Sequence, residues 1–203
     1  MNGFERMKEQ TRRSILDAAL ELFKSYGFKK VSISEIAQSA NVSPVTIYNH
    51  FGSKDGLIRE VVKALLQDMM ERYWALLRED RPFPEKIQAM VFDKTEIGSQ
   101  FRGELVQTVY QSDPQLREFI DVLFQQEINS FIMEMLEGGK REGYVDPGLS
   151  PEALRLFMEI LRRGVAASPD LLPGSEEPDI EVLRQLNYIF VYGLMGRSEN
   201  ERR

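Results

Sequence analysis

Apolar residues recur every three or four positions through most of this chain, which is the spacing of one buried face on an α-helix. The clearest stripes predict helices over residues 4–26, 54–78, 114–142, 151–167 and 179–196. Shorter stripes predict two small helices between residues 32 and 52, one from about residue 84 that Gly98 interrupts, and one near residues 101–110. No useful length of chain alternates with the period of two typical of a β-strand. The sequence therefore predicts an all-α protein of about nine helices.

Two of the short stripes, between residues 32 and 57, are joined by a tight turn. Ser32 followed by Glu35 is the pattern of a capping box, in which each side chain satisfies a backbone N–H at the start of a helix. Asn41 tolerates the left-handed backbone that ends the first helix, and Ser43 is a cap for the second. A helix of about eight residues, a turn of about four and a helix of about seven predict a helix-turn-helix.

The second helix of this pair has a polar side opposite its apolar seam of Ile47 and Phe51. Its other side chains are small, hydrogen-bonding or aromatic, and these suit base edges, a thymine methyl group and phosphate oxygens. A plain helical hairpin with a solvated face is the alternative for any one of them alone. The expected DNA contacts are Thr11, Ser32, Ser43, Pro44, Val45, Thr46, Tyr48, Asn49, His50 and Lys54.

The same segment resembles the TetR-type transcriptional regulators, named for the tetracycline repressor. The resemblance covers about the first 60 residues strongly. It rests on Ile15, residues 18–23, Gly27, Ser32, Ile36, Ala37, Ala40, Val42, Ser43, Ile47, Tyr48, His50, Phe51, Lys54 and Leu57. Val45 departs from the pattern, because such proteins often carry glycine or another small residue there. Base preference is therefore not carried over from the family.

The resemblance implies a three-helix DNA-binding domain, expected here over residues 1–53, and a helical ligand-binding and dimerisation domain over residues 54–203. It also implies a homodimer that represses transcription from a double-stranded DNA operator until a small-molecule effector releases it. The alternative is a DNA-bound factor of the same fold that recruits a protein partner and has no small-molecule inducer.

Three apolar bands of the larger domain, at residues 54–78, 101–110 and 114–142, are wider than one packing face requires. We expect them to enclose a ligand pocket, with a solid core as the alternative. The absence of Lys and Arg from the expected inner faces favours a neutral or cationic apolar ligand over an anion. The expected lining is Met69, Tyr73, Phe101, Leu105, Phe124 and Ile128, with Tyr110 and Gln125 as polar contacts.

The last two stripes, at residues 151–167 and 179–196, predict a four-helix interface between two copies of the chain. The alternative is that they only close the core of one chain. The expected interface residues are Leu154, Phe157, Leu161, Gly164, Leu183, Leu186, Phe190 and Leu194.

The distribution of charge makes a net charge of −6 compatible with DNA binding. Residues 1–65 carry 10 Lys and Arg against 7 Asp and Glu, a net charge of +3, and the remainder, with 16 against 25, carries −9. A weakly basic head on an acidic body orients the head towards DNA, and chance asymmetry is the alternative. The cluster of Arg6, Lys8, Arg12 and Arg13 is either a set of phosphate contacts or a solvated helix end.

Little in the chain suggests an enzyme or a metal site. The sequence has no cysteine and one histidine, so we expect no catalytic set, no metal and no cofactor. Gly138 and Gly139 lie near a predicted helix end and indicate a helix break, not a phosphate-binding loop. No apolar run approaches the ~18 residues of a membrane span and no signal peptide is evident, so a cytoplasmic protein without a membrane partner is expected.

Overall fold

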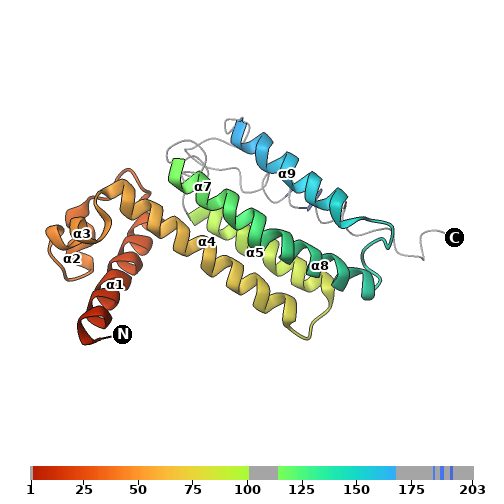
Figure 1. Ribbon diagram of the computed structural model, residues 1–203, viewed down its shortest axis with the longest axis horizontal. Helices are drawn as coiled ribbons and strands as arrows, with labels where there is room; N and C mark the ends of the chain where they lie inside the picture. The colour runs from red at the N-terminus through yellow and green to blue at the C-terminus, as the bar shows by residue number, and fades with distance from the viewer. Residues whose placement is uncertain (1, 101–113, 168–184, 186–187, 190–192, 194–203) are drawn as a thin grey trace.

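In the computed structural model, a small helical head lies at one end of an elongated molecule and a larger helical body extends from it (Figure 1). The structure describes residues 2–100, 114–167, 185, 188–189 and 193. Every regular element in these residues is a helix, which confirms the all-α class there. The number of helices expected from the sequence is not reached within them, because the segments expected as helices at 101–110 and 179–196 lie outside the described residues or are described only at isolated positions.

The head consists of α1 (Gly3–Tyr26), α2 (Ile33–Ser39) and α3 (Pro44–Phe51). The predicted capping box at the start of α2 is confirmed. Ser32 Oγ accepts a hydrogen bond from the Glu35 N–H at 3.2 Å, and Glu35 Oε2 accepts one from the Ser32 N–H at 2.7 Å. The Ser32 hydroxyl, which donates to the Glu35 carboxylate, lowers the pKa of Glu35 most, and the Ser32 N–H lowers it further. Asn41 has a φ of 54°, so the left-handed turn predicted between α2 and α3 is confirmed as well.

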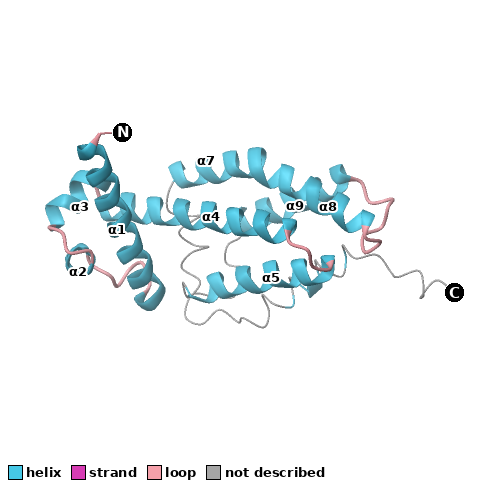
Figure 2. Ribbon diagram, turned by 90° about the horizontal axis from the view of Figure 1, so that it is seen from below, coloured by secondary structure: helices cyan, strands magenta, loops and turns pink. Residues whose placement is uncertain are grey.

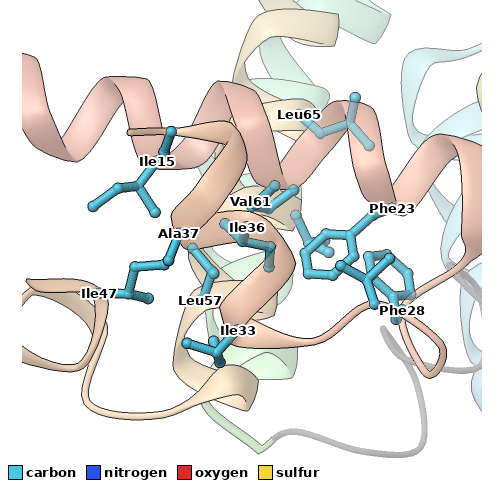
Figure 3. Packing of buried hydrophobic residues seen from close by; sticks show 14 of the residues in the cluster. Ile15, Phe23, Phe28, Ile33, Ile36, Ala37, Ile47, Leu57, Val61 and Leu65 are labelled. Atoms are coloured by element: carbon cyan, nitrogen blue, oxygen red, sulfur yellow. The ribbon is translucent and has the colours of Figure 1, made fainter. Parts of the chain in front are cut away.

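One apolar cluster holds the head together and continues beyond it (Figure 3). Ile15, Ile36 and Ile47 bring α1, α2 and α3 to this cluster, and each has an exposed fraction of 0%. The cluster follows α4 (Lys54–Arg78) as far as Leu65 and includes Leu116, which is also fully buried. The boundary expected between residues 53 and 54 therefore coincides with the start of α4 but not with a break in packing.

The body places α4 between α5 (Phe83–Gln100) and the pair α7 (Pro114–Leu123) and α8 (Asn129–Arg141), with α9 (Pro151–Ala167) packed on α8 (Figures 1 and 2). α4 runs away from the head and α5 returns towards it. α7 and α8 together run away from the head, and α9 returns. A second apolar cluster, which includes Met70, Phe83, Phe131 and Leu136, fills the space between them. Among the described helices, none combines the length and the apolar character needed to cross a bilayer.

Two predicted details of the body are wrong. α5 continues through Gly98 to Gln100, because a glycine keeps its N–H and weakens a helix by only ~1 kcal/mol relative to alanine. The helix predicted over residues 114–142 is interrupted by a π-helical turn, η2 (Phe124–Ile128). Side chains that follow this turn satisfy its backbone, since Asn129 Nδ2 donates to the carbonyl oxygen of Gln125 at 3.2 Å.

The helix break predicted at Gly138 and Gly139 is also wrong, because both lie inside α8. Gly139 allows two apolar side chains to approach the helix backbone. A Cβ atom at this position would lie 2.5 Å from Val145 Cγ2 and 2.7 Å from Phe83 Cζ. Gly139 therefore reflects close packing at the far end of the body.

We expect Gly139→Ala to lower the free energy of unfolding by ~1–3 kcal/mol, because its methyl group overpacks against Phe83 and Val145. Gly138→Ala is the matched control, since a Cβ atom there meets nothing within 4 Å. The control should raise the free energy of unfolding by roughly 0.5–1 kcal/mol through helix propensity. Urea unfolding followed by circular dichroism measures both, and equal effects of the two substitutions would contradict the close approach at Gly139.

Candidate nucleic-acid interface

Helix α3 is seated on the head core by one side and faces outwards with the other. Ile47 is fully buried, and Phe51 is partly buried against the same core. The outer side exposes Val45 at 64% and Tyr48 at 49%, with Asn49 exposed next to them. The structure therefore presents the residues expected to read DNA on the surface of the head.

The hydroxyl groups near α2 and α3 hold the starts of these helices. Ser43 Oγ accepts a hydrogen bond from the Thr46 N–H at 3.1 Å and lies 2.8 Å from Thr46 Oγ1. Ser32 Oγ donates to Glu35 Oε2 at 2.6 Å. These residues, expected at DNA, thus also position the two helices of the helix-turn-helix.

Lys54, the first residue of α4, reaches back to the loop between α1 and α2. Its Nζ donates to the carbonyl oxygen of Lys29 at 3.2 Å. An ammonium group has three donors, so this bond leaves others for a phosphate oxygen. Of the remaining expected contacts, Thr11 and His50 are partly buried and Pro44 is exposed.

Arg12 has partners that sequence reasoning missed. Its Nη2 lies 2.5 Å from Glu60 Oε2 on α4, and its guanidinium lies 5.7 Å from the centre of the Phe51 ring. Arg12, on α1, therefore contacts both α3 and α4, whereas the other basic residues at the start of α1 are exposed. Glu60 lies 48 residues further along the chain, and no local pattern indicates this pairing.

Comparison with known proteins agrees with this geometry. The family described as "Bacterial regulatory proteins, tetR family" matches residues 15–61, which span the head core and the start of α4. The HTH-type transcriptional regulator UidR of Escherichia coli strain K12 is 27% identical over 172 residues, which cover 82% of this chain and 85% of UidR. The head of this chain carries the DNA-binding domain of the TetR family of transcriptional regulators.

Two solved structures share the fold of this chain. A putative transcriptional regulator from Saccharomonospora viridis, in complex with choline, superposes with a TM-score of 0.64 at 21% identity and covers 93% of this chain and 100% of its own. FadR from Bacillus subtilis, in complex with stearoyl-CoA, superposes with a TM-score of 0.58 at 20% identity, over 90% of this chain and 98% of its own. At these identities the likeness concerns the fold, and it extends through the body as well as the head.

The residues expected to bind an effector in the regulator's body are only partly brought together. Met69 and Ile128 are partly buried against the body core, and Gln125 is exposed. Tyr73 is buried and its hydroxyl donates to the carbonyl oxygen of Met90 at 3.1 Å. Burial, and secondarily the Asp93 carboxylate, raises the pKa of Tyr73, so the hydroxyl stays neutral. Phe101, Leu105, Tyr110 and the side chain of Phe124 lie outside the described residues.

The expectation that no Lys or Arg lies on the inner faces of the body stays a prediction, because part of the expected lining, at residues 101–113, lies outside the described residues. Lys63 lies between α4 and α7, with Nζ 5.4 Å from the centre of the Phe119 ring. The same Nζ is 3.2 Å from Glu60 Oε1, which balances its charge. Among the described residues, no group of three His, Cys, Asp or Glu side chains is placed to hold a metal ion.

Helix α9 partly exposes four large apolar side chains on one face. Leu156, Phe157, Ile160 and Leu161 have exposed fractions of 52%, 46%, 59% and 45%. Leu154, expected at the interface, is instead 4% exposed in the body core, because it lies on the side of α9 that faces that core. A Cβ atom at Gly164 would meet nothing within 4 Å. Leu183, Leu186, Phe190 and Leu194 lie outside the described residues.

We expect Ser43→Ala to lower the free energy of unfolding of the regulator by ~1 kcal/mol, because it removes the cap of α3. Ser34→Ala is the control, since Ser34 is exposed inside α2 and its loss should change stability by less than ~0.5 kcal/mol. Urea unfolding monitored by circular dichroism compares the two. A loss at Ser34 as large as that at Ser43 would show that the cap has no special role.

Proposed function

We propose that this TetR-family regulator is a homodimeric repressor that leaves its operator when a small apolar effector, neutral or cationic, binds in its body. The exposed face of α3 carries the DNA part of this proposal, because Val45, Tyr48 and Asn49 are held outwards by the burial of Ile47. A recognition helix held in this way is suited to enter the major groove.

We assign the contacts on DNA according to position and side-chain chemistry. Thr46 and Asn49, together with Val45, contact bases, since a hydroxyl, a carboxamide and a methyl group match base edges. Tyr48 and Lys54 contact phosphates and set the register of the head on the duplex. The other proposed contacts border this face: Thr11, Ser32, Ser43, Pro44 and His50.

The exposed apolar face of α9 supports assembly into a dimer. Four large apolar side chains within six residues are unusual on the surface of a chain that acts alone. A two-fold axis next to this face places it against itself and gives two heads, as operators with two half-sites require. Tyr188 and Ile189, with exposed fractions of 54% and 67%, extend the apolar surface of the C-terminal part of the chain.

The proposed effector follows from charge and from the neighbours of the fold. The Saccharomonospora viridis protein holds choline, a cation, and Bacillus subtilis FadR holds stearoyl-CoA, an anion with a long apolar chain. In this chain Lys63 is paired with Glu60, and Arg72 is paired with Asp93 at 3.2 Å. Glu60 and Asp93 balance these two cations, which favours a neutral or cationic effector over an anion.

A selection of genomic DNA fragments by the purified protein tests this function and yields its operator. Choline and stearoyl-CoA then serve as probes of opposite charge in operator binding measured by fluorescence anisotropy. Release by choline or other quaternary ammonium compounds is the expected result, and release by stearoyl-CoA alone would contradict the charge argument. Enrichment of a fragment that no small molecule in a broad panel releases would favour the alternative, a DNA-bound factor that recruits a protein.

We expect Lys54→Ala to weaken binding to every DNA sequence alike and to reduce the slope of log affinity against log salt by about 1, because one phosphate contact is lost. Asn49→Ala should instead weaken the selected operator by ~1–3 kcal/mol and leave non-specific DNA nearly unchanged. Anisotropy titrations at several salt concentrations measure both effects. An unchanged salt slope in Lys54→Ala would remove this lysine from the phosphate contacts.

We expect Leu161→Glu to produce monomers that bind the operator poorly, because a carboxylate in the apolar α9 face opposes its own copy across the two-fold axis. Gln88→Glu adds the same charge at an exposed position of α5 and should leave the dimer intact. Light scattering gives the molecular mass of each variant. A dimer mass for Leu161→Glu would exclude this face as the interface.

A further inference from the structure

The body touches the head by a second route besides the length of α4. The start of α7 packs directly into the head core, where Leu116 is fully buried, and Phe119 and Ile120 pack against the same cluster. Because α7 and α8 also form one wall of the body, this contact joins the body to the head core at a second place besides α4.

A group of charged side chains bridges this contact at its surface. Glu60, on α4, offers one oxygen to each of two cations: Oε1 lies 3.2 Å from Lys63 Nζ, and Oε2 lies 2.5 Å from Arg12 Nη2. Each cation also lies over an aromatic ring, Lys63 over Phe119 of α7 and Arg12 over Phe51 of α3. We call these five residues the Glu60 cluster.

The Glu60 cluster thus forms an unbroken chain of contacts from the body to the recognition helix. Phe119 belongs to α7, Lys63 and Glu60 to α4, Arg12 to α1, and Phe51 is the last residue of α3. The side chains of Arg12, Glu60 and Lys63 are 33%, 31% and 27% exposed. Their attractions are therefore screened by solvent less than those of fully exposed pairs.

We propose that Glu60 is a positioning residue that couples the placement of α7 to the orientation of α3. One carboxylate cannot keep both contacts if the cations move apart, so a shift of Phe119 and Lys63 changes the position available to Arg12 and Phe51. The inference deepens the proposed function, because it names the residue through which an effector next to α7 weakens DNA reading. The geometric coupling itself exists in the protein without DNA or effector.

A double-mutant cycle between the two ends of the Glu60 cluster tests this coupling. Phe119→Leu perturbs the α7 end and Arg12→Met perturbs the α1 and α3 end, each alone and together, with Glu60 intact and in Glu60→Gln. The first readout is the hydrogen–deuterium exchange of the α3 amides in the DNA-free protein. The second is affinity for the selected operator, in which the cycle cancels any direct contact of Arg12 with DNA.

With Glu60 intact, the effects of the two substitutions on the exchange rates of the α3 amides should deviate from additivity by about threefold or more. In Glu60→Gln they should be additive within about twofold, because the carboxamide cannot hold two cations. Glu71→Gln, an exposed position on the same helix, is the matched control and should preserve the deviation. If Glu60 only stabilises the fold, Glu60→Gln lowers the melting temperature, but the deviation from additivity is the same with Glu60 intact and in Glu60→Gln. An equal deviation in both backgrounds, or no deviation in either, would overturn the proposal.

If Phe119→Leu does not fold, Lys63→Met takes its place at the same end of the cluster. The exchange readout needs no operator, so it decides the role of Glu60 even if no DNA fragment is bound and the proposed function fails. Conversely, additive exchange effects in a protein that binds and releases its operator would overturn the role of Glu60 and leave the proposed function standing.

Discussion

The placement of α3 depends above all on the burial of one apolar side chain, Ile47, in the core of the head. A helix of eight residues does not hold its shape or direction alone, because its few backbone bonds barely offset the cost of nucleation. Ile47 fixes the rotation of α3 about its axis, and the Ser43 cap fixes where the helix begins. With both in place, the outward direction of Val45, Tyr48 and Asn49 follows from helix geometry.

The same core explains why head and body form one mechanical unit. α4 contributes Leu57, Val61 and Leu65 to the head before it enters the body, and α7 adds Leu116 from the other side. The head is thus packed against two body helices that are far apart in sequence. A regulator built in this way can pass a change in the body to the proposed DNA-reading surface through packed side chains. In our proposal, the charged contacts around Glu60 couple the placement of α7 to the orientation of α3.

The body divides its apolar surface between two uses. The stripe that includes Leu154 and Met158 closes the core of the chain, whereas the neighbouring stripe of α9, from Leu156 to Leu161, remains exposed. Near the C-terminal end of α8, Gly139 lets Phe83 and Val145 pack against the helix backbone. The body therefore combines a firmly packed end, far from the head, with an apolar face suited to a second copy.

The sequence by itself determined the features whose causes are local. The capping box of Ser32 and Glu35, the left-handed Asn41, the cap at Ser43 and the range of α4 all follow from residues within one or two helical turns. The expected DNA-reading face was also predictable, because Ile47 and Phe51 mark the buried side of α3. The spacing of apolar residues also identified most of the helices, because the buried side of a helix repeats every three or four residues.

Only the tertiary structure decided the features that depend on distant neighbours. Arg12 seemed equivalent to the other basic residues of α1 until folding placed Glu60 next to it, 48 residues away. Leu154, Phe157 and Leu161 belong to one apolar stripe in the sequence, yet packing of α9 on α8 buries the first and leaves the other two half exposed. Gly139 suggested a helix break because glycine often ends helices. Its local sequence gives no sign that Phe83 packs against the helix backbone there. In each case the deciding partner lies far along the chain or on another helix, where neither periodicity nor capping patterns carry information.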